Sequence, residues 1–293
     1  MLTINELLSK GILLFDGAMG TSIQKFNLPD VDPPELINLN HPDKLKEIHL
    51  KYIEAGSNII ETNTFGGSRL RLNLSELGDK VKEINTAAVR IAKEAAKGKA
   101  YVAGSVGPLG VLIEPYGELS SEEAFNTYKE QIEILLEAGV DLILIETMIS
   151  LDEALIALNA AKEAGSKITG VTLTFDSGAL GLRTSFGESP SDAILKLKES
   201  GADFVGSNCG HGLTDILLAA EEMKKVCDLP ILIQPNAGLP EFIDGNIVYN
   251  ESPEMFMKFT QRAISLGVNF IGGCCGTTDL HIKAANSVLR KSS

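Results

Sequence analysis

Eight short apolar runs recur along the chain, and each is followed by a longer segment with the spacing of an amphipathic helix. Most of these runs are rich in Ile, Val and Leu, which is typical of parallel strands that are buried on both faces. The pattern therefore predicts a repeated unit of one strand and one helix. The predicted strands are residues 12–16, 58–63, 101–106, 141–146, 168–175, 203–208, 231–235 and 269–274.

Capping residues mark the ends of the helices between these strands. A helix predicted over 43–55 ends at Gly56, and one over 120–138 begins at a Ser-Ser-Glu-Glu cap and ends at Gly139. A third helix occupies 189–200, with a Ser cap ahead of a Pro in its first turn. A glycine at the turn between a helix and the next strand recurs at Gly56, Gly139, Gly201 and Gly267, which indicates one motif repeated along the chain.

Eight strands that alternate with eight helices predict an α/β fold, a parallel (β/α)8 TIM barrel. We expect a single domain over residues 1–293, with a short helix at about 3–10 before the first strand. A doubly wound open sheet would need a phosphate-binding loop after its first strand, and residues 16–21 lack the G-x-G-x-x-G spacing. The barrel is therefore the preferred fold.

Charge and hydropathy narrow the possible partners. The chain has 26 Lys and Arg against 39 Asp and Glu, a formal net charge of −13, which opposes binding to nucleic acid or to an anionic membrane. No apolar stretch reaches the roughly 18 residues of a membrane span, and the first residues lack a signal-peptide pattern. We expect a soluble, cytoplasmic protein with neither kind of partner.

Three of the four cysteines fall where the predicted strands end, which is where TIM barrels place their chemistry. Cys209 follows the sixth strand, and Cys274 and Cys275 follow the eighth. Adjacent residues of a regular strand point to opposite sides, so the Gly-Gly-Cys-Cys-Gly segment must kink for both thiols to face inward, and its glycines permit positive φ. Three thiolates and one open position match a catalytic Zn²⁺ site.

Other interpretations of these residues stay open at this point. Cys274 and Cys275 could be small residues of a tight turn or a vicinal disulfide, and Cys209 could be a buried thiol. His211 could be a fourth ligand or a polar group behind the ligands. Cys227 ends a helix away from the strand ends, so we expect it to be structural.

Two acidic residues also lie at predicted strand ends. Asp16 follows the first strand and Glu146 ends the fourth. Either could be a salt-bridged structural carboxylate, but two acids in a mouth that holds a metal are better explained by binding of a substrate ammonium group.

Together these motifs resemble the zinc-dependent homocysteine S-methyltransferases, and the resemblance covers nearly the whole chain. It is closest to the homocysteine-binding module of cobalamin-dependent methionine synthase because of the Pro-Asn-Ala-Gly-Leu-Pro segment. The segments that carry it are residues 16–21 (DGAMGT), 61–65 (ETNTF), 146–147 (ET), 208–209 (NC), 235–240 (PNAGLP) and 272–276 (GGCCG).

The resemblance implies one Zn²⁺ per chain, held by Cys209, Cys274 and Cys275, with the sulfur of homocysteine as the fourth ligand. Coordination by zinc deprotonates a thiol that is otherwise a poor nucleophile at neutral pH. The expected reaction is transfer of a methyl group to this zinc-bound thiolate, which gives methionine.

It also implies how the rest of homocysteine is bound. By resemblance, Glu146 and Asp16 hold the amino group, and the backbone amides around Gly17 and Ala18 hold the carboxylate. Two further residues are expected to make polar contacts in the site, namely Asn208 and Asn236.

The methyl donor is the least determined part of the reaction. Stand-alone members of the family use S-methylmethionine or betaine, and such cations need aromatic receptors. The chain has no Trp and only 5% aromatic residues. We therefore predict methylcobalamin, carried by another domain or protein. The aromatic residues expected near the mouth are Phe65, Tyr116, Phe175 and Phe186.

Functions of other classes remain as alternatives. A TIM-barrel lyase or aldolase would need a Schiff-base Lys or a cluster of Mg²⁺-binding carboxylates at the strand ends, and no Lys falls there. A non-enzymatic zinc or redox sensor would differ from an enzyme in lacking an exchangeable position on the metal.

Overall fold

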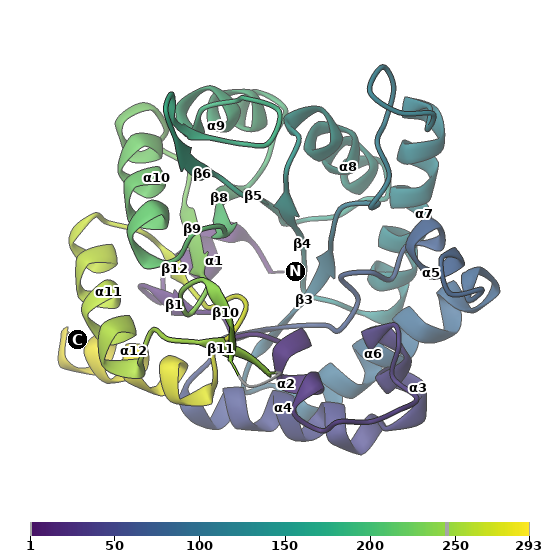
Figure 1. Cartoon of the computed structure of the whole chain (residues 1–293), viewed down its shortest axis with the longest axis horizontal. Helices are drawn as coiled ribbons and strands as arrows, with labels where there is room; N and C mark the ends of the chain where they lie inside the picture. The colour runs from purple at the N-terminus through teal and green to yellow at the C-terminus, as the bar shows by residue number, and fades with distance from the viewer. Residues whose placement is uncertain (1, 244–245, 293) are drawn as a thin grey trace.

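The computed structural model of the chain describes residues 2–243 and 246–292, and Figure 1 shows a ring of strands enclosed by helices. Eight parallel strands pair in the order β1-β12-β9-β8-β5-β4-β3-β2. Their bounds are β1 Leu13–Leu14, β2 Ile59–Glu61, β3 Tyr101–Val106, β4 Leu142–Met148, β5 Thr169–Leu173, β8 Phe204–Cys209, β9 Ile231–Pro235 and β12 Phe270–Ile271.

Asn58 joins the first strand to the second. Its backbone N–H donates to the Leu14 carbonyl at 2.7 Å, and its side-chain oxygen accepts from the Leu14 N–H at 2.9 Å. The ring is thereby closed, and the predicted TIM barrel is confirmed. The outermost residues of the predicted domain, 1 and 293, lie outside the described part of the chain, so these domain limits stay a prediction.

Eight longer helices follow the barrel strands and cover the outside of the ring (Figure 1). None of the described helices combines the length and the apolar character that crossing a bilayer requires. Their bounds are α4 Pro42–Ala55, α6 Val81–Ala96, α7 Ser121–Ala138, α8 Leu151–Glu163, α9 Pro190–Glu199, α10 Leu213–Val226, α11 Pro253–Ser265 and α12 Asp279–Ser292.

The helix ends agree with the capping residues in the sequence. Ser120 and Glu123 form a capping box at the start of α7, and Gly139 ends the helix in the left-handed conformation at φ 98°. Gly56 ends α4 in the same way, at φ 117°. These ends were predictable because each depends on residues within one helical turn.

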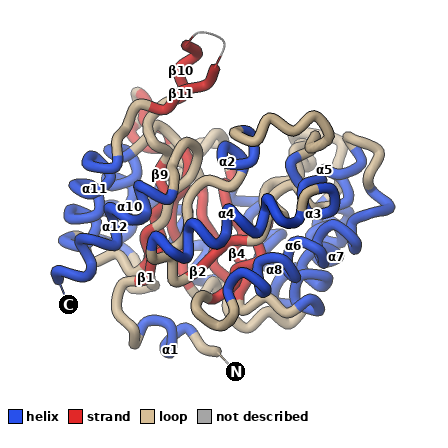
Figure 2. The backbone as a smooth tube through the Cα atoms, turned by 90° about the horizontal axis from the view of Figure 1, so that it is seen from below, coloured by secondary structure: helices blue, strands red, loops and turns tan. Residues whose placement is uncertain are grey.

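Shorter helical segments lie before the first strand and in the loops. The first of them, Ile4–Leu8, lies within the predicted N-terminal helix and is seen in Figure 2 at the end of the barrel opposite the β10–β11 hairpin. Its Leu7 packs with the apolar residues inside the barrel. The bounds are α1 Ile4–Leu8, α2 Gly20–Gln24, η1 Pro34–Leu36, α3 Ile37–Asn40, α5 Arg69–Asn73 and η2 Gly78–Lys80.

Three phenylalanines fill the barrel interior beneath its mouth. Phe15, Phe204 and Phe270 are fully buried, and their ring centroids lie 5.0 to 6.4 Å apart in tilted and edge-on arrangements. This packed layer supports the polar residues at the strand ends.

Two antiparallel hairpins were not predicted. One consists of β6 (Asp176–Gly178) and β7 (Gly181–Arg183), and the other of β10 (Pro240–Ile243) and β11 (Asn246–Tyr249). The second projects from the barrel, as Figure 2 shows. Both are inserted between a strand and its helix, so the barrel repeat carries no signal for them.

His49 on α4 predicts a pH-dependent stability. It is fully buried, and within the described part of the chain neither ring nitrogen has a hydrogen-bond partner. Burial lowers its pKa to about 4, so the unfolded chain binds a proton more readily than the folded chain between pH 6.5 and 4. Stability is therefore lost as the pH falls through this window, by about 2 kcal/mol between pH 7.5 and pH 5.

The variant His49→Leu is expected to remove this loss. Urea unfolding of the variant and the wild type at both pH values measures it. An equal fall in the free energy of unfolding for the two proteins would show that His49 is not responsible.

Candidate active site

Three thiols converge at the C-terminal mouth of the barrel. Cys209 ends β8, Cys274 and Cys275 follow β12, and their sulfur atoms all lie within 4.8 Å of one another. All four cysteines of the chain are free, so the vicinal-disulfide interpretation does not hold. Cys227 lies in the hydrophobic core at 6% exposure, outside this cluster.

The backbone around the thiols includes three left-handed residues. Cys209 itself has φ 65°, which is uncommon for a residue other than glycine, and Gly210 and Gly276 have φ 68° and 80°. Gly273 is required for a different reason, since a Cβ there would lie 2.3 Å from Thr277 Oγ1. The kink expected around the cysteine pair is present, but of the three glycines there Gly276 alone has a positive φ.

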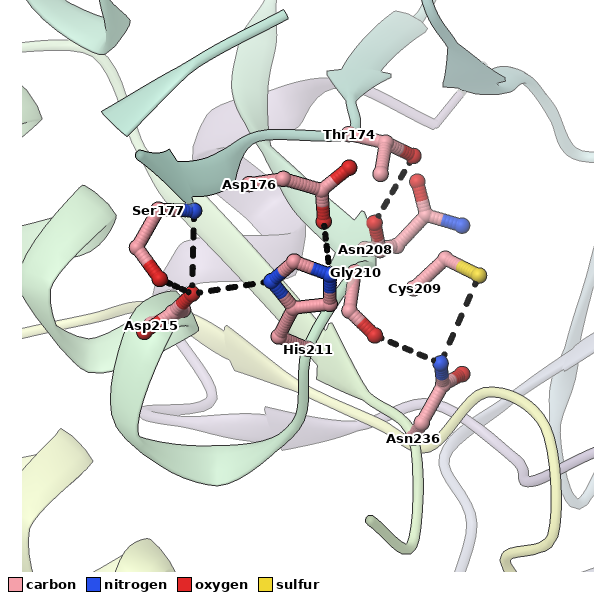
Figure 3. A network of polar contacts seen from close by, with 9 residues as sticks. All are labelled: Thr174, Asp176, Ser177, Asn208, Cys209, Gly210, His211, Asp215 and Asn236. Carbon is pink, nitrogen blue, oxygen red and sulfur yellow. Dashed lines mark hydrogen bonds and ion pairs between the residues drawn. The ribbon is translucent and has the colours of Figure 1, made fainter. Parts of the chain in front are cut away.

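The thiols are electrostatically coupled. Hydrogen bonds from Cys274 and Cys275 hold the pKa of Cys209 far below its usual range, and the contact with Cys209 raises the pKa of Cys274. The Asn236 side chain donates to Cys209 Sγ at 3.6 Å and to the Gly210 carbonyl at 2.8 Å (Figure 3). Its buried Oδ1 has no partner among the described residues. Three clustered cysteine sulfurs are ligands that a soft metal cation prefers.

Three carboxyl groups lie in the same mouth. Asp16, Glu61 and Glu146 lie close to where β1, β2 and β4 end, and burial raises the pKa of each. Mutual repulsion adds to the upward shift of Asp16 and Glu61.

Neighbouring polar groups hold these carboxyls in place. Gln234 donates to Glu61 Oε1 at 2.6 Å, and the Glu61 N–H donates to Asp16 Oδ2 at 3.0 Å. The Ser105 hydroxyl donates to Glu146 Oε1. The acids are therefore ordered before any ligand binds.

Asn208 links the carboxyl groups to the thiols. Its side-chain amide group lies 2.6 Å from Thr147 Oγ1 and 3.3 Å from Glu146 Oε2, and 3.9 Å from Cys274 Sγ. Its oxygen accepts from the Thr147 N–H and the Thr172 hydroxyl, each at 2.8 Å. This side chain thus has its hydrogen-bonding capacity occupied within the protein.

A cavity of about 220 Å³ lies between the thiol cluster and the carboxyl groups and is lined by both. Its walls come from the ends of β1, β2, β3, β4, β8, β9 and β12. Four acids line it, and no Lys, Arg or His occurs among its described lining residues. The acids are Asp16, Glu35, Glu61 and Glu146.

The sequence-predicted residues divide into two sets. Asp16, Gly17, Ala18 and Glu146 line the cavity together with the three clustered cysteines. The other set, Asn208 and Asn236, bonds to the groups that line it rather than lining it.

Two predicted roles need adjustment. The Ala18 N–H already donates to Thr277 Oγ1 at 3.1 Å, so it is engaged within the protein. His211 lies between Asp176 and Asp215, at 3.7 and 3.6 Å, and Figure 3 shows it directed toward these acids rather than into the thiol cluster. The interpretation of His211 as a metal ligand is therefore not supported.

Three residues of the site were given no role in the sequence analysis. Glu61 and Gln234 lie near the ends of predicted strands, where the rule that gave Asp16 and Glu146 their roles applies to them as well. Tyr249 packs against Gly276, next to the cysteine pair, but it lies on the unpredicted hairpin, so no sequence signal pointed to it.

The description of the family whose model matches residues 13–289 is homocysteine S-methyltransferase. The chain belongs to this family. Methionine synthase from Mycobacterium leprae (strain TN) is 30% identical over 297 residues, which cover 95% of this chain and 24% of that protein. Methionine synthase from Mycobacterium tuberculosis has the same identity and the same coverage over 298 residues. This homocysteine S-methyltransferase chain thus spans about a quarter of the length of these curated relatives.

Solved structures show the same fold. The metallated form of the homocysteine methyltransferase MmuM from Escherichia coli has a TM-score of 0.81, with 24% identity, over 96% of this chain and 98% of that chain. Its oxidized form has a TM-score of 0.80, with 25% identity, over 99% of each chain. These structures support the barrel fold, and the matching family model confirms the predicted family.

Proposed function

We propose that this chain is a zinc-dependent methyltransferase that binds homocysteine and converts it to methionine. One observation carries the proposal: a single small cavity joins three thiols to three buried carboxyl groups, with no basic side chain among its described lining. Thiols and carboxyl groups both favour positively charged ligands. Zinc would bind at the thiols, and the ammonium group of homocysteine would bind at the carboxyl groups.

The thiols of Cys209, Cys274 and Cys275 would hold the zinc. Their sulfur atoms are close enough to share one ion, and hydrogen bonds from the other two thiols lower the pKa of Cys209. When bound, Zn²⁺ deprotonates a coordinated substrate thiol and leaves it nucleophilic at neutral pH. Hydrogen bonds from Asn236 and Asn208 to two of the sulfurs orient them toward a common centre.

The carboxyl groups would bind the homocysteine ammonium group. Burial raises the pKa of Glu61 and of Glu146, and the charge of Glu146 raises the pKa of Glu61 further, because two charged acids cannot be buried together without compensation. An arriving ammonium group would supply the compensating positive charge and favour the ionised form of both acids. We assign Glu146 and Asp16 to direct contact, with Glu61 completing the cluster.

The substrate carboxylate would lie against the loop that follows β1. Gly17 and Ala18 line the cavity there, as expected. Because the Ala18 N–H is bonded to Thr277, we assign the carboxylate contact to the Gly17 amide and give Ala18 the role of shaping the wall.

Methylcobalamin, carried by another domain or protein, is the proposed methyl donor. Among the described residues that line the cavity, Phe65 is the one aromatic side chain. Phe175 is buried in the core, and Tyr116 and Phe186 pack edge-on at 5.1 Å beside a separate hollow of about 580 Å³. The lining thus offers little of the aromatic cage that a sulfonium or quaternary ammonium donor needs.

A competition among donors tests this choice. With homocysteine saturating and the donors at equal concentration, we expect methionine to form faster from methylcobalamin than from S-methylmethionine or betaine. The Cys227→Ser variant, altered outside the cavity, should give the same order. Faster turnover with S-methylmethionine or betaine would instead favour the stand-alone type of enzyme and leave the proposed zinc site intact.

A zinc or redox sensor is the second candidate function. The cavity beside the thiols argues against it, since a sensor needs no binding site for an amino acid next to its metal. Titration of the zinc-loaded protein with homocysteine distinguishes the two, because a closed metal site would bind none.

A further inference from the structure

Of the four acids that line the cavity in the described part of the chain, Glu35 alone has no role in the proposed function. It lies on η1 and is 5% exposed, and its Oε1 accepts from the Gly66 N–H at 2.7 Å. A Cβ on Gly66 would lie only 2.7 Å from this oxygen, so a side chain at position 66 would displace the carboxyl group. The carboxyl group of Glu35 is thus bonded to the loop that follows β2.

The peptide group between Phe65 and Gly66 is held on both sides. Its N–H donates to Glu35, and its carbonyl, on Phe65, accepts from the Gly107 N–H at 3.1 Å. A Cβ on Gly107 would lie 2.6 Å from the Phe65 ring, so the ring packs directly on the backbone there. Two hydrogen bonds and one packing contact therefore set the direction in which Phe65 leaves the loop.

Amide bonds attach the segment that carries Glu35 to the same loop. The Asn63 side chain donates to the Pro34 carbonyl at 3.0 Å and to Asn38 Oδ1 at 2.8 Å. The Asn38 side chain donates back to the Asn63 carbonyl at 2.9 Å. Both asparagines are buried, so water does not compete for these bonds. Glu35 is therefore held in place independently of its own bond to Gly66.

Phe65 is the largest apolar side chain in the lining of the cavity. The other apolar side chains in the described lining are those of Ala18, Met19 and Pro34. Homocysteine has two methylene groups between its sulfur and its α-carbon, and their burial against an apolar wall favours binding. A ring that is already fixed provides such a wall without losing conformational entropy when the substrate binds.

We propose that Glu35 is a positioning residue, which fixes Phe65 as the apolar wall against which the methylene groups of homocysteine pack. The inference rests on the proposed function, since it assigns this wall to that substrate. The role requires a hydrogen-bond acceptor at position 35 and no negative charge. This requirement distinguishes Glu35 from Asp16 and Glu146, which are proposed to act through their charge.

Two substitutions of Glu35 test this role. Glu35→Leu removes the acceptor, and Glu35→Gln keeps one in the same place. Hydrogen exchange of the Gly66 amide, followed by nuclear magnetic resonance, reports the bond, and calorimetric titration of the zinc-loaded proteins reports homocysteine affinity. We expect Glu35→Leu to speed this exchange and to weaken homocysteine binding, each by about tenfold, with zinc content unchanged. Glu35→Gln should resemble the wild type in both measurements.

Glu153→Leu is the matched control for the loss of a buried acceptor. Glu153 is 7% exposed and accepts from the Leu109 N–H at 2.8 Å, but it does not line the cavity. This variant should lose stability without a change in homocysteine affinity or in the exchange of the Gly66 amide.

The outcomes separate this inference from the proposed function. Equal homocysteine affinity in Glu35→Leu and the wild type would overturn the inference. Binding by Glu35→Gln as weak as that by Glu35→Leu would also overturn it, because Glu35 would then act through its charge. Failure of the zinc-loaded wild type to bind homocysteine would overturn the proposed function, and the wall assigned to its substrate with it.

Phe65→Ala tests the same wall if Glu35→Leu does not fold. It removes the ring and leaves the backbone bonds of the loop in place, so homocysteine affinity should fall about tenfold while exchange of the Gly66 amide stays slow. Unchanged affinity in Phe65→Ala would show that the substrate does not pack on this ring.

Discussion

Replacing Cys274 by Ser is expected to abolish both zinc binding and methyl transfer to homocysteine. Its sulfur lies within 4.8 Å of the other two, and a neutral hydroxyl in its place leaves only two thiolates for the ion. Zinc content should fall from one ion per chain to near zero, and methionine formation to the background rate. Metal analysis of the purified variant and an assay with homocysteine measure the two effects.

Cys227→Ser is the matched control for this experiment. Cys227 is also a free thiol, but it lies in the core at the end of α10, away from the mouth. The variant should retain its zinc. Full retention of zinc by Cys274→Ser, or loss of zinc from a folded Cys227→Ser protein, would contradict the ligand assignment.

Glu146→Gln is expected to weaken homocysteine binding by about 10- to 150-fold while zinc content stays near that of the wild type. The amide keeps the shape of the side chain, but it removes the negative charge that would pair with the substrate ammonium group. Calorimetric titration of the zinc-loaded protein with homocysteine measures the affinity.

Glu153→Gln is the matched control, because it makes the same substitution at a buried glutamate outside the cavity. Glu153 is buried on α8 and accepts from the Leu109 N–H at 2.8 Å and the Tyr128 hydroxyl at 2.7 Å, but it does not line the cavity. Its substitution should change stability without changing homocysteine affinity. Equal affinity in wild type and Glu146→Gln would mean that Glu146 is a structural carboxylate.

The choice of methyl donor depends on the aromatic residues near the cavity, and the sequence did not predict correctly which of them line it. Each of four aromatic residues lies at or beyond the end of a predicted strand and was therefore expected near the mouth, namely Phe65, Tyr116, Phe175 and Phe186. In the structure only Phe65 faces the cavity, because Phe175 turns into the core and the other two pack on each other at the rim. Position along a strand identifies the end of the barrel, but not the direction of a side chain on a loop.

The sequence by itself determined the barrel, its family and the three thiols. Strand and helix periodicities of about 2 and 3.6 residues are local properties, and capping depends on neighbours within one turn, so the elements could be predicted from the chain. Parallel strands in a closed ring must end at the same rim, which is why Cys209, Cys274 and Cys275 were expected together. Asp16 and Glu146 were found by the same rule.

Only the tertiary structure decided how these groups face one another. Glu61 and Glu146 are 85 residues apart in sequence but line one cavity, Asn208 connects Glu146 with Cys274, and Tyr249 packs against Gly276 from an inserted hairpin. Such contacts depend on the register around the closed ring and on loop conformations such as the left-handed backbone of Cys209. Neither follows from periodicity, because side-chain direction at a strand end is set by long-range packing and hydrogen bonding rather than by the local chain.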